Sequence, residues 1–191
     1  MRTTLAVSAL LIAGCAGIGY VATTDPYQKL GQAQSLVGED RLLAAEDVIG
    51  QALSTFQQRN DIAGMAEAYH AYGNLYKNGL FQDGRWTPKF QELGTWDGTY
   101  TKSIANFSKA QQLFEQSADE IGAVKCLVGA GNAYSLRNDK PKACALYREA
   151  LTRYRNAKGT GQPLKAHPIL TGYADIGALT EAFIAKERCG T

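Results

Sequence analysis

Small and aromatic residues recur at intervals of three and four in several parts of this chain. In residues 127–134 a leucine is followed after three residues by Ala-Gly and, after three more, by tyrosine. In residues 143–150 an aromatic residue lies between two alanines. Such intervals place side chains on one face of an α-helix, and runs of β-branched residues are missing beyond residue 26. The sequence therefore predicts an all-α fold with an internal repeat. Related patterns occur at 33–36, 45–52, 69–76 and 103–110.

The repeat resembles the tetratricopeptide repeat family, in which each unit is an antiparallel helix pair of about 34 residues. In that family a small residue lies where the two helices approach most closely, and here it is Ala33, Gly73 or Gly131. The usual tryptophan and the usual closing proline are absent from every unit. The resemblance implies an α-α superhelix closed by a capping helix. The expected units are 27–58, 64–116 and 122–155, and the expected capping helix is 173–188.

The middle unit contains an insertion, residues 78–100. The small residue of the first helix precedes the small residue of the second by 12 positions in the outer units and by 30 in this one. Loops rich in aromatic residues either fold onto the body or present anchors to a partner, and the sequence leaves both readings open. The aromatic residues singled out here are Phe81, Trp86, Phe90, Trp96 and Tyr100.

The N-terminus has the features of a secretory signal. Arg2 precedes an apolar run, Leu5 to Ala13, which as a helix would span about 14 Å, roughly half the hydrocarbon core of a bilayer. That length is too short to cross a membrane and fits a cleaved signal at residues 1–14. The ending, Leu11 to Cys15, resembles a bacterial lipobox. The resemblance implies cleavage just before Cys15 and attachment of lipid to its thiol.

The residue after Cys15 is Ala16, whereas an Asp at this position tends to retain such lipoproteins in the inner membrane. The resemblance therefore implies an anchor in the bacterial outer membrane, with the protein facing the periplasm. Residues 15–26 would be the lipidated cysteine and a tether. The alternative is a plain signal peptide in which Cys15 is incidental.

Composition and motifs give no sign of nucleic-acid binding or of catalysis. The 20 Lys and Arg residues against 18 Asp and Glu leave a charge of +2, and no basic run is present. The sequence has no Gly-x-Ser-x-Gly elbow, phosphate loop or His-Glu-x₂-His pair. Neither His70 nor His167 has the orienting partner that a catalytic base needs. We therefore expect no enzyme activity, no cofactor and no metal site.

Three amide residues, Gln34, Asn74 and Asn132, directly follow the small packing residues. The resemblance implies that they line a concave groove, where an asparagine holds the backbone of a bound peptide. The basic clamp of peptide-binding members is incomplete, since Gly129 stands where a polar contact is expected. Asparagine is also a common filler at this place, so a purely structural row stays open. The residues expected to flank the row are Tyr27, His70, Lys77, Lys125 and Ser135.

Three cysteines would remain after cleavage, in an oxidising compartment. Cys126 and Cys144 lie near the starts of two antiparallel helices, and therefore at opposite ends of a hairpin, too far apart for a disulfide. Cys189 follows the capping helix and can fold back. We predict a Cys144–Cys189 disulfide and a buried, free Cys126. The Cys-x₂-Cys spacing of a zinc or redox site is absent.

These features predict a lipid-anchored outer-membrane protein that acts as a protein–protein adaptor or assembly factor. Its partner would be an envelope protein or a peptide segment. The alternative is a lipoprotein that binds the cell wall or a small ligand, with the aromatic insertion stacking on sugars.

Overall fold

The computed structural model describes residues 22–79, 88, 92, 98–161, 165 and 172–190. All regular secondary structure in these residues is helical, which confirms the all-α prediction. The predicted signal peptide, Cys15 and most of the aromatic insertion (Phe81, Trp86, Phe90 and Trp96) lie outside the described residues. The helices with described bounds are α1 (Pro26–Gly38), α2 (Leu42–Gln58), α3 (Ile62–Lys77), α5 (Thr101–Gln116), α6 (Glu120–Leu136), α7 (Lys140–Gly159) and α8 (Ile176–Lys186).

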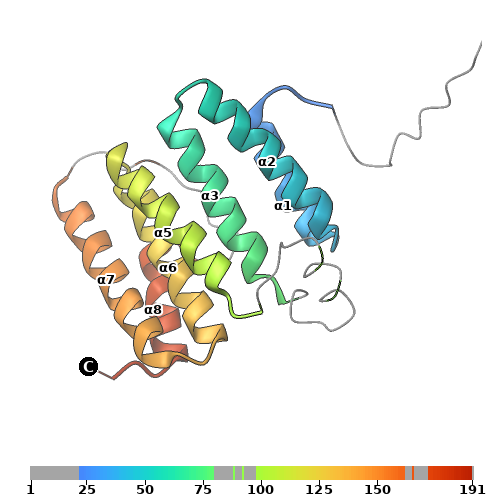
Figure 1. The fold of residues 1–191 in the computed structure, drawn as a ribbon. Coiled ribbons are helices and arrows are strands. Elements are labelled where there is room, and N and C mark those ends of the chain that lie inside the picture. Colours follow the sequence, from blue (N-terminus) through green and yellow to red (C-terminus); the bar gives the residue numbers. More distant parts are fainter. Residues whose placement is uncertain are drawn as a thin grey trace, which may run out of the picture.

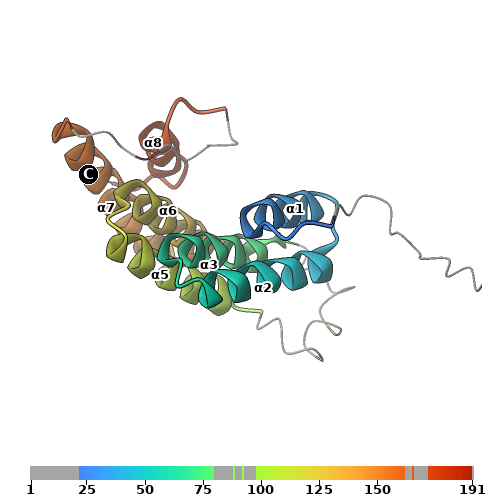
Figure 2. The ribbon, with the colours of Figure 1, turned by 90° about the horizontal axis from the view of Figure 1, so that it is seen from above.

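Among the helices with described bounds, each packs against the next one along the chain, so α3 contacts α5 (Figure 1). A second set of contacts joins alternate helices: α1 touches α3, α3 touches α6, and α6 touches α8. Seen from above, α1 and α8 lie on the same side of α3 and α6 (Figure 2). The four alternate helices therefore form one layer, and α2, α5 and α7 pack against it.

One kind of three-residue turn joins the helices at 39–41, 59–61, 117–119 and 137–139. Its middle residue is left-handed, with φ between 52° and 63° at Asp40, Asn60, Ala118 and Asn138. The N–H of its last residue donates to the carbonyl five residues earlier, at 2.8–2.9 Å. This bond satisfies a carbonyl that the end of a helix would otherwise leave unpaired. The same local geometry thus sets the direction of each following helix.

Aspartate begins most of the helices. In each case the carboxylate accepts a hydrogen bond from a backbone N–H of the first turn, which is otherwise unpaired. The sequence analysis did not use this signal, although the aspartates stand at regular places before the apolar pattern of each helix. The capping residues are Asp25, Asp61, Asp119, Asp139 and Asp175.

The core is built from large residues of the second helices that lie against glycines of the first. Phe107 of α5 packs on Gly73, where an added Cβ would lie 2.7 Å from the ring, and Tyr147 of α7 packs on Gly131, at 2.5 Å. Contacts this short leave no room for a side chain, so these positions require glycine. The aromatic–glycine spacing of the sequence is therefore the packing between the two helices of a hairpin.

A second aromatic row packs in the other direction, and two of its three members follow Phe107 and Tyr147 by seven residues. Phe56, Phe114 and Tyr154 are buried against the first helix of the following hairpin. Their rings lie where a Cβ would stand at Gly64, Gly122 and Gly177, at 2.0, 2.4 and 2.3 Å. One row closes each hairpin and the other joins it to its neighbour.

Candidate binding face on helices α3 and α6

The polar residues expected to line a groove lie mainly on two helices that touch each other. His70, Asn74 and Lys77 lie on α3, and Lys125, Asn132 and Ser135 lie on α6. Gln34 is exposed on α1. The α3–α6 face is defined here as the exposed and half-buried polar residues Glu67, His70, Asn74, Lys77 and Lys125.

Three residues of α3 form one cluster at intervals of four and three. Asn74 is exposed, and its Nδ2 lies 3.4 Å from Nδ1 of His70. Lys77 Nζ donates to Oδ1 of the same amide at 3.2 Å. The side-chain amide of Asn74 is thus held between a ring and a cation, which fixes its orientation while one side stays open to solvent.

Phe107 lies beneath this cluster. Its ring is fully buried between Gly73 of α3 and Gly129 of α6, where an added Cβ would lie 2.5 Å away. The His70 ring meets it edge-on with centroids 5.6 Å apart, and Lys77 Nζ lies 5.6 Å from its centroid. Gly129 stands where a polar contact of the clamp was expected. Because it has no side chain, it leaves the space that the Phe107 ring fills.

Burial lowers the pKa of Lys77 to about 8, because the charged amine loses water that the surrounding protein does not replace. The cation–π contact with Phe107 and the amide of Asn74 offset part of that loss. Lys77 can therefore change its charge close to physiological pH.

Lys125 reaches from α6 towards α3. Its Nζ lies 3.9 Å from Oε2 of Glu67, and both side chains are partly buried. The charge predicted to face a ligand is thus balanced by an acidic residue that the sequence analysis did not name. Glu67 lies three residues before His70, on the same helical face, and that spacing is the signal that could have found it.

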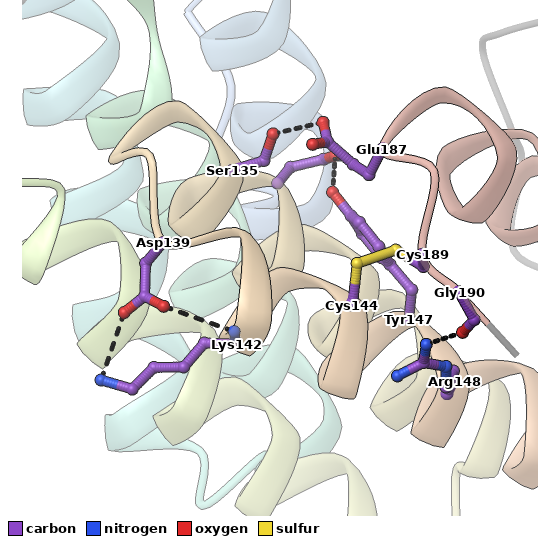
Figure 3. The surroundings of a disulfide bond; sticks show 10 residues. Ser135, Asp139, Lys142, Cys144, Tyr147, Arg148, Glu187, Cys189 and Gly190 are labelled. Atoms are coloured by element: carbon purple, nitrogen blue, oxygen red, sulfur yellow. Dashed lines mark hydrogen bonds and ion pairs between the residues drawn. A yellow bond between two sulfur atoms is a disulfide. The ribbon is translucent and has the colours of Figure 1, made fainter.

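The α6 end of the predicted row has a different environment. Tyr147 donates its hydroxyl to Oδ1 of Asn132 at 2.7 Å, and Ser135 donates to Oε1 of Glu187 at 2.5 Å. Phe183 of α8 stacks on Tyr147 with centroids 5.5 Å apart. Figure 3 shows the Ser135–Glu187 contact beside the C-terminal turn. The side chains of Asn132 and Ser135 therefore form hydrogen bonds within the protein.

The first unit supplies Gln34, which is exposed on α1, and Tyr27. Tyr27, expected to flank the row, donates its hydroxyl to Oδ2 of Asp61 at 3.1 Å and meets Phe56 edge-on, with centroids 4.8 Å apart. It is therefore tied to the start of α3.

The cysteines pair as the sequence predicts. A disulfide joins Cys144 to Cys189, with Cα atoms 5.5 Å apart (Figure 3). Cys126 is buried and unpaired, and burial raises the pKa of its thiol, which keeps it protonated and unreactive. Tyr100, the described member of the aromatic set, is half-buried before α5 in a left-handed conformation, with φ of 58°.

Within the part of the chain that the structure describes, no three or more His, Cys, Asp or Glu side chains gather where a metal ion could bind. No described helix has the length and apolar character needed to cross a bilayer. Comparison of the chain with family models, with curated proteins and with solved structures gives no match.

Proposed function

We propose that this chain is a bacterial outer-membrane lipoprotein that faces the periplasm and binds a peptide segment of an envelope protein. Cys15 would carry the lipid, and residues 15–26 would tether the helical body to the membrane. In this role the protein is an adaptor or assembly factor, because its site offers recognition groups in place of a catalytic constellation.

For the body we propose a tetratricopeptide-like superhelix. The repeated three-residue turn, the two aromatic rows and the layer formed by α1, α3, α6 and α8 support this arrangement. A layer of alternate helices leaves its outward side chains on a common surface, as in other repeat proteins. The α3–α6 face lies at the middle of that layer.

One observation carries the binding proposal: Asn74 is exposed, oriented by its neighbours and supported by a rigid floor. A side-chain amide has both a donor and an acceptor, so it pairs with the N–H and C=O of an extended peptide. Phe107, fixed between two glycines, limits the movement of His70 and Lys77 above it. A preorganised site loses less conformational entropy on binding.

The test is in-cell crosslinking of the membrane-anchored protein, comparing wild type with His70→Ala/Asn74→Ala. The matched control is Lys109→Ala/Gln112→Ala, two exposed residues of α5. We expect one envelope protein to be captured by wild type and by the control, and to be lost in the α3 variant. Equal capture by all three proteins would remove the α3–α6 face as the binding site. Loss confined to Trp86→Ala/Trp96→Ala would assign binding to the insertion.

The anchor is tested separately, by Cys15→Ala. We expect the wild-type protein to fractionate with membranes and to incorporate labelled palmitate, and the variant to do neither. Covalent acyl chains give stable anchoring when more than one is attached, so the difference should be nearly complete. A variant that stays in the membrane fraction would contradict the lipid anchor.

A further inference from the structure

A series of links joins α7 to the C-terminal segment in antiparallel order. At one end Lys158 Nζ lies 3.7 Å from Oδ2 of Asp175, and Arg155 donates to Oε1 of Glu181 at 2.9 Å. Both pairs are largely exposed, and ion pairs of this kind hold a helix weakly. At the other end, Arg148 donates to the carbonyl of Gly190, and the Cys144–Cys189 disulfide closes the series (Figure 3).

The disulfide is the covalent member of this series, and α8 depends on it more than the other helices do. α8 has 11 residues, too few for a stable helix in isolation. α2, α3, α6 and α7 each follow a three-residue turn, whereas residues 160–175 separate α8 from α7. The disulfide joins cysteines 45 positions apart, so it closes a long loop that contains α8.

The segment held by the disulfide covers one end of the predicted amide row. Glu187 accepts the Ser135 hydroxyl, and Phe183 stacks on Tyr147, which in turn donates to Asn132. Glu187 and Cys189 belong to the same turn, in which Cys189 N–H donates to the Ile184 carbonyl at 3.0 Å. Release of Cys189 would therefore loosen the contact with Ser135 directly and the stacking of Phe183 through α8.

We propose that the Cys144–Cys189 disulfide is a redox-sensitive latch. In the oxidised protein it holds residues 187–190 and the end of α8 over Ser135 and Tyr147. Reduction by a dithiol releases this segment and uncovers the α6 end of the row. The latch is a property of the chain alone, so its test needs no partner.

The chemistry is a thiol–disulfide exchange with a dithiol reductant. Cys189 is half-buried and Cys144 is buried, so the attacking thiolate reaches Sγ of Cys189. The sulfur–sulfur bond breaks, and Sγ of Cys144 leaves as a thiolate and takes up a proton. The second thiol of the reductant then attacks the mixed disulfide, which frees Cys189 as a thiol and closes the disulfide of the reductant. The protein gains two electrons and two protons, and the dithiol loses them.

The test is hydrogen–deuterium exchange of the full chain, read by mass spectrometry before and after treatment with dithiothreitol. We expect amides of α8 and of residues 187–190 to exchange at least about tenfold faster after reduction, because the loop is no longer closed. Amides of α3 should change by less than about twofold, since opening is local.

Two variants separate the latch from general destabilisation. Cys189→Ala should give the fast α8 exchange without reductant. Arg155→Gln is the matched control: it removes one exposed link to α8 and keeps the disulfide, so its exchange should match that of the oxidised wild type. Slow α8 exchange in reduced protein would overturn the latch. Equal acceleration in α3 would also overturn it, because the disulfide would then hold the whole fold.

Discussion

Asn74 and Asn132 occupy equivalent places in two consecutive units, yet the structure uses them differently. Each follows the glycine on which an aromatic ring of the second helix packs: Phe107 on Gly73, and Tyr147 on Gly131. The tyrosine hydroxyl donates to Asn132, and α8 stacks on the same ring. Phenylalanine has no hydroxyl, and Asn74 is exposed. The hydroxyl of Tyr147 therefore accounts for a main difference between the two residues: Asn132 forms a hydrogen bond within the fold, whereas Asn74 faces solvent.

The two helix pairs, α3 with α5 and α6 with α7, are also joined by different hydrogen bonds. In the second unit the buried Ser103 hydroxyl donates to the carbonyl of Gly73 at 2.7 Å. In the third unit Ala143 stands at the corresponding place, and the Tyr147–Asn132 bond links the two helices. The two helix pairs therefore keep the same apolar spacing although the hydrogen bond between the helices differs, and Asn74, which takes no part in such a bond, is exposed.

The largest expected effect tests what the two units share. Gly73→Val and Gly131→Val should each destabilise the protein by about 3 kcal/mol, because the new side chain overlaps a buried ring. Urea unfolding followed by circular dichroism measures the change. Gly31→Ala is the control: no atom lies near its Cβ, so this variant should gain up to about 1 kcal/mol from helix propensity.

The next largest effect comes from removing the Tyr147–Asn132 hydrogen bond, which distinguishes the third unit from the second. Tyr147→Phe leaves the Asn132 carbonyl oxygen without its tyrosine donor and should cost about 1–2 kcal/mol in the free energy of unfolding. Asn132→Ala should cost a similar amount, and the double variant less than the sum, because both single changes remove one bond. Strict additivity in this double-mutant cycle would show that the bond contributes nothing.

A pH titration tests the surroundings of Asn74, because Lys77 donates a hydrogen bond to its side chain. Folding lowers the pKa of Lys77 to about 8 from an ordinary value near 10.4, so between these values the unfolded chain binds more protons and stability rises with pH. From pH 7 to 9 this adds about 1 kcal/mol to the free energy of unfolding. Lys77→Met should remove this increment. Identical pH profiles for the variant and wild type would contradict the assignment.

The smallest expected change is at Asn74. Because Asn74 is exposed, Asn74→Ala should alter stability by no more than about 0.5 kcal/mol. Its partner capture should nevertheless fall. A stability loss as large as that of Asn132→Ala would mean that the two residues have the same structural role.

The spacing of small and aromatic residues was enough to predict the helices, and the resemblance implied that the two helices of a pair approach most closely at Gly73 and Gly131. The spacing also contained most of the second row, since Phe114 and Tyr154 follow Phe107 and Tyr147 by seven residues, but that interval was not used. The fate of Asn132 could not be predicted from spacing, because it depends on where one hydroxyl points after the helices pack. Glu67 differs from Asn132: its spacing from His70 placed it on the same helical face, but its pairing with Lys125 crosses from one helix to another.

The recurring three-residue turn connects successive helices in the same way at four places in the chain. α3 and α5 pack together as the other pairs do, although residues 78–100 connect them in place of such a turn. In a shortened chain, Arg-Asn-Asp, the sequence of residues 137–139, would replace residues 78–100 and connect α3 to α5 by the same kind of turn. We expect the shortened protein to keep the packing of α3 on α5, so it would show which activities belong to the helices and which to residues 78–100.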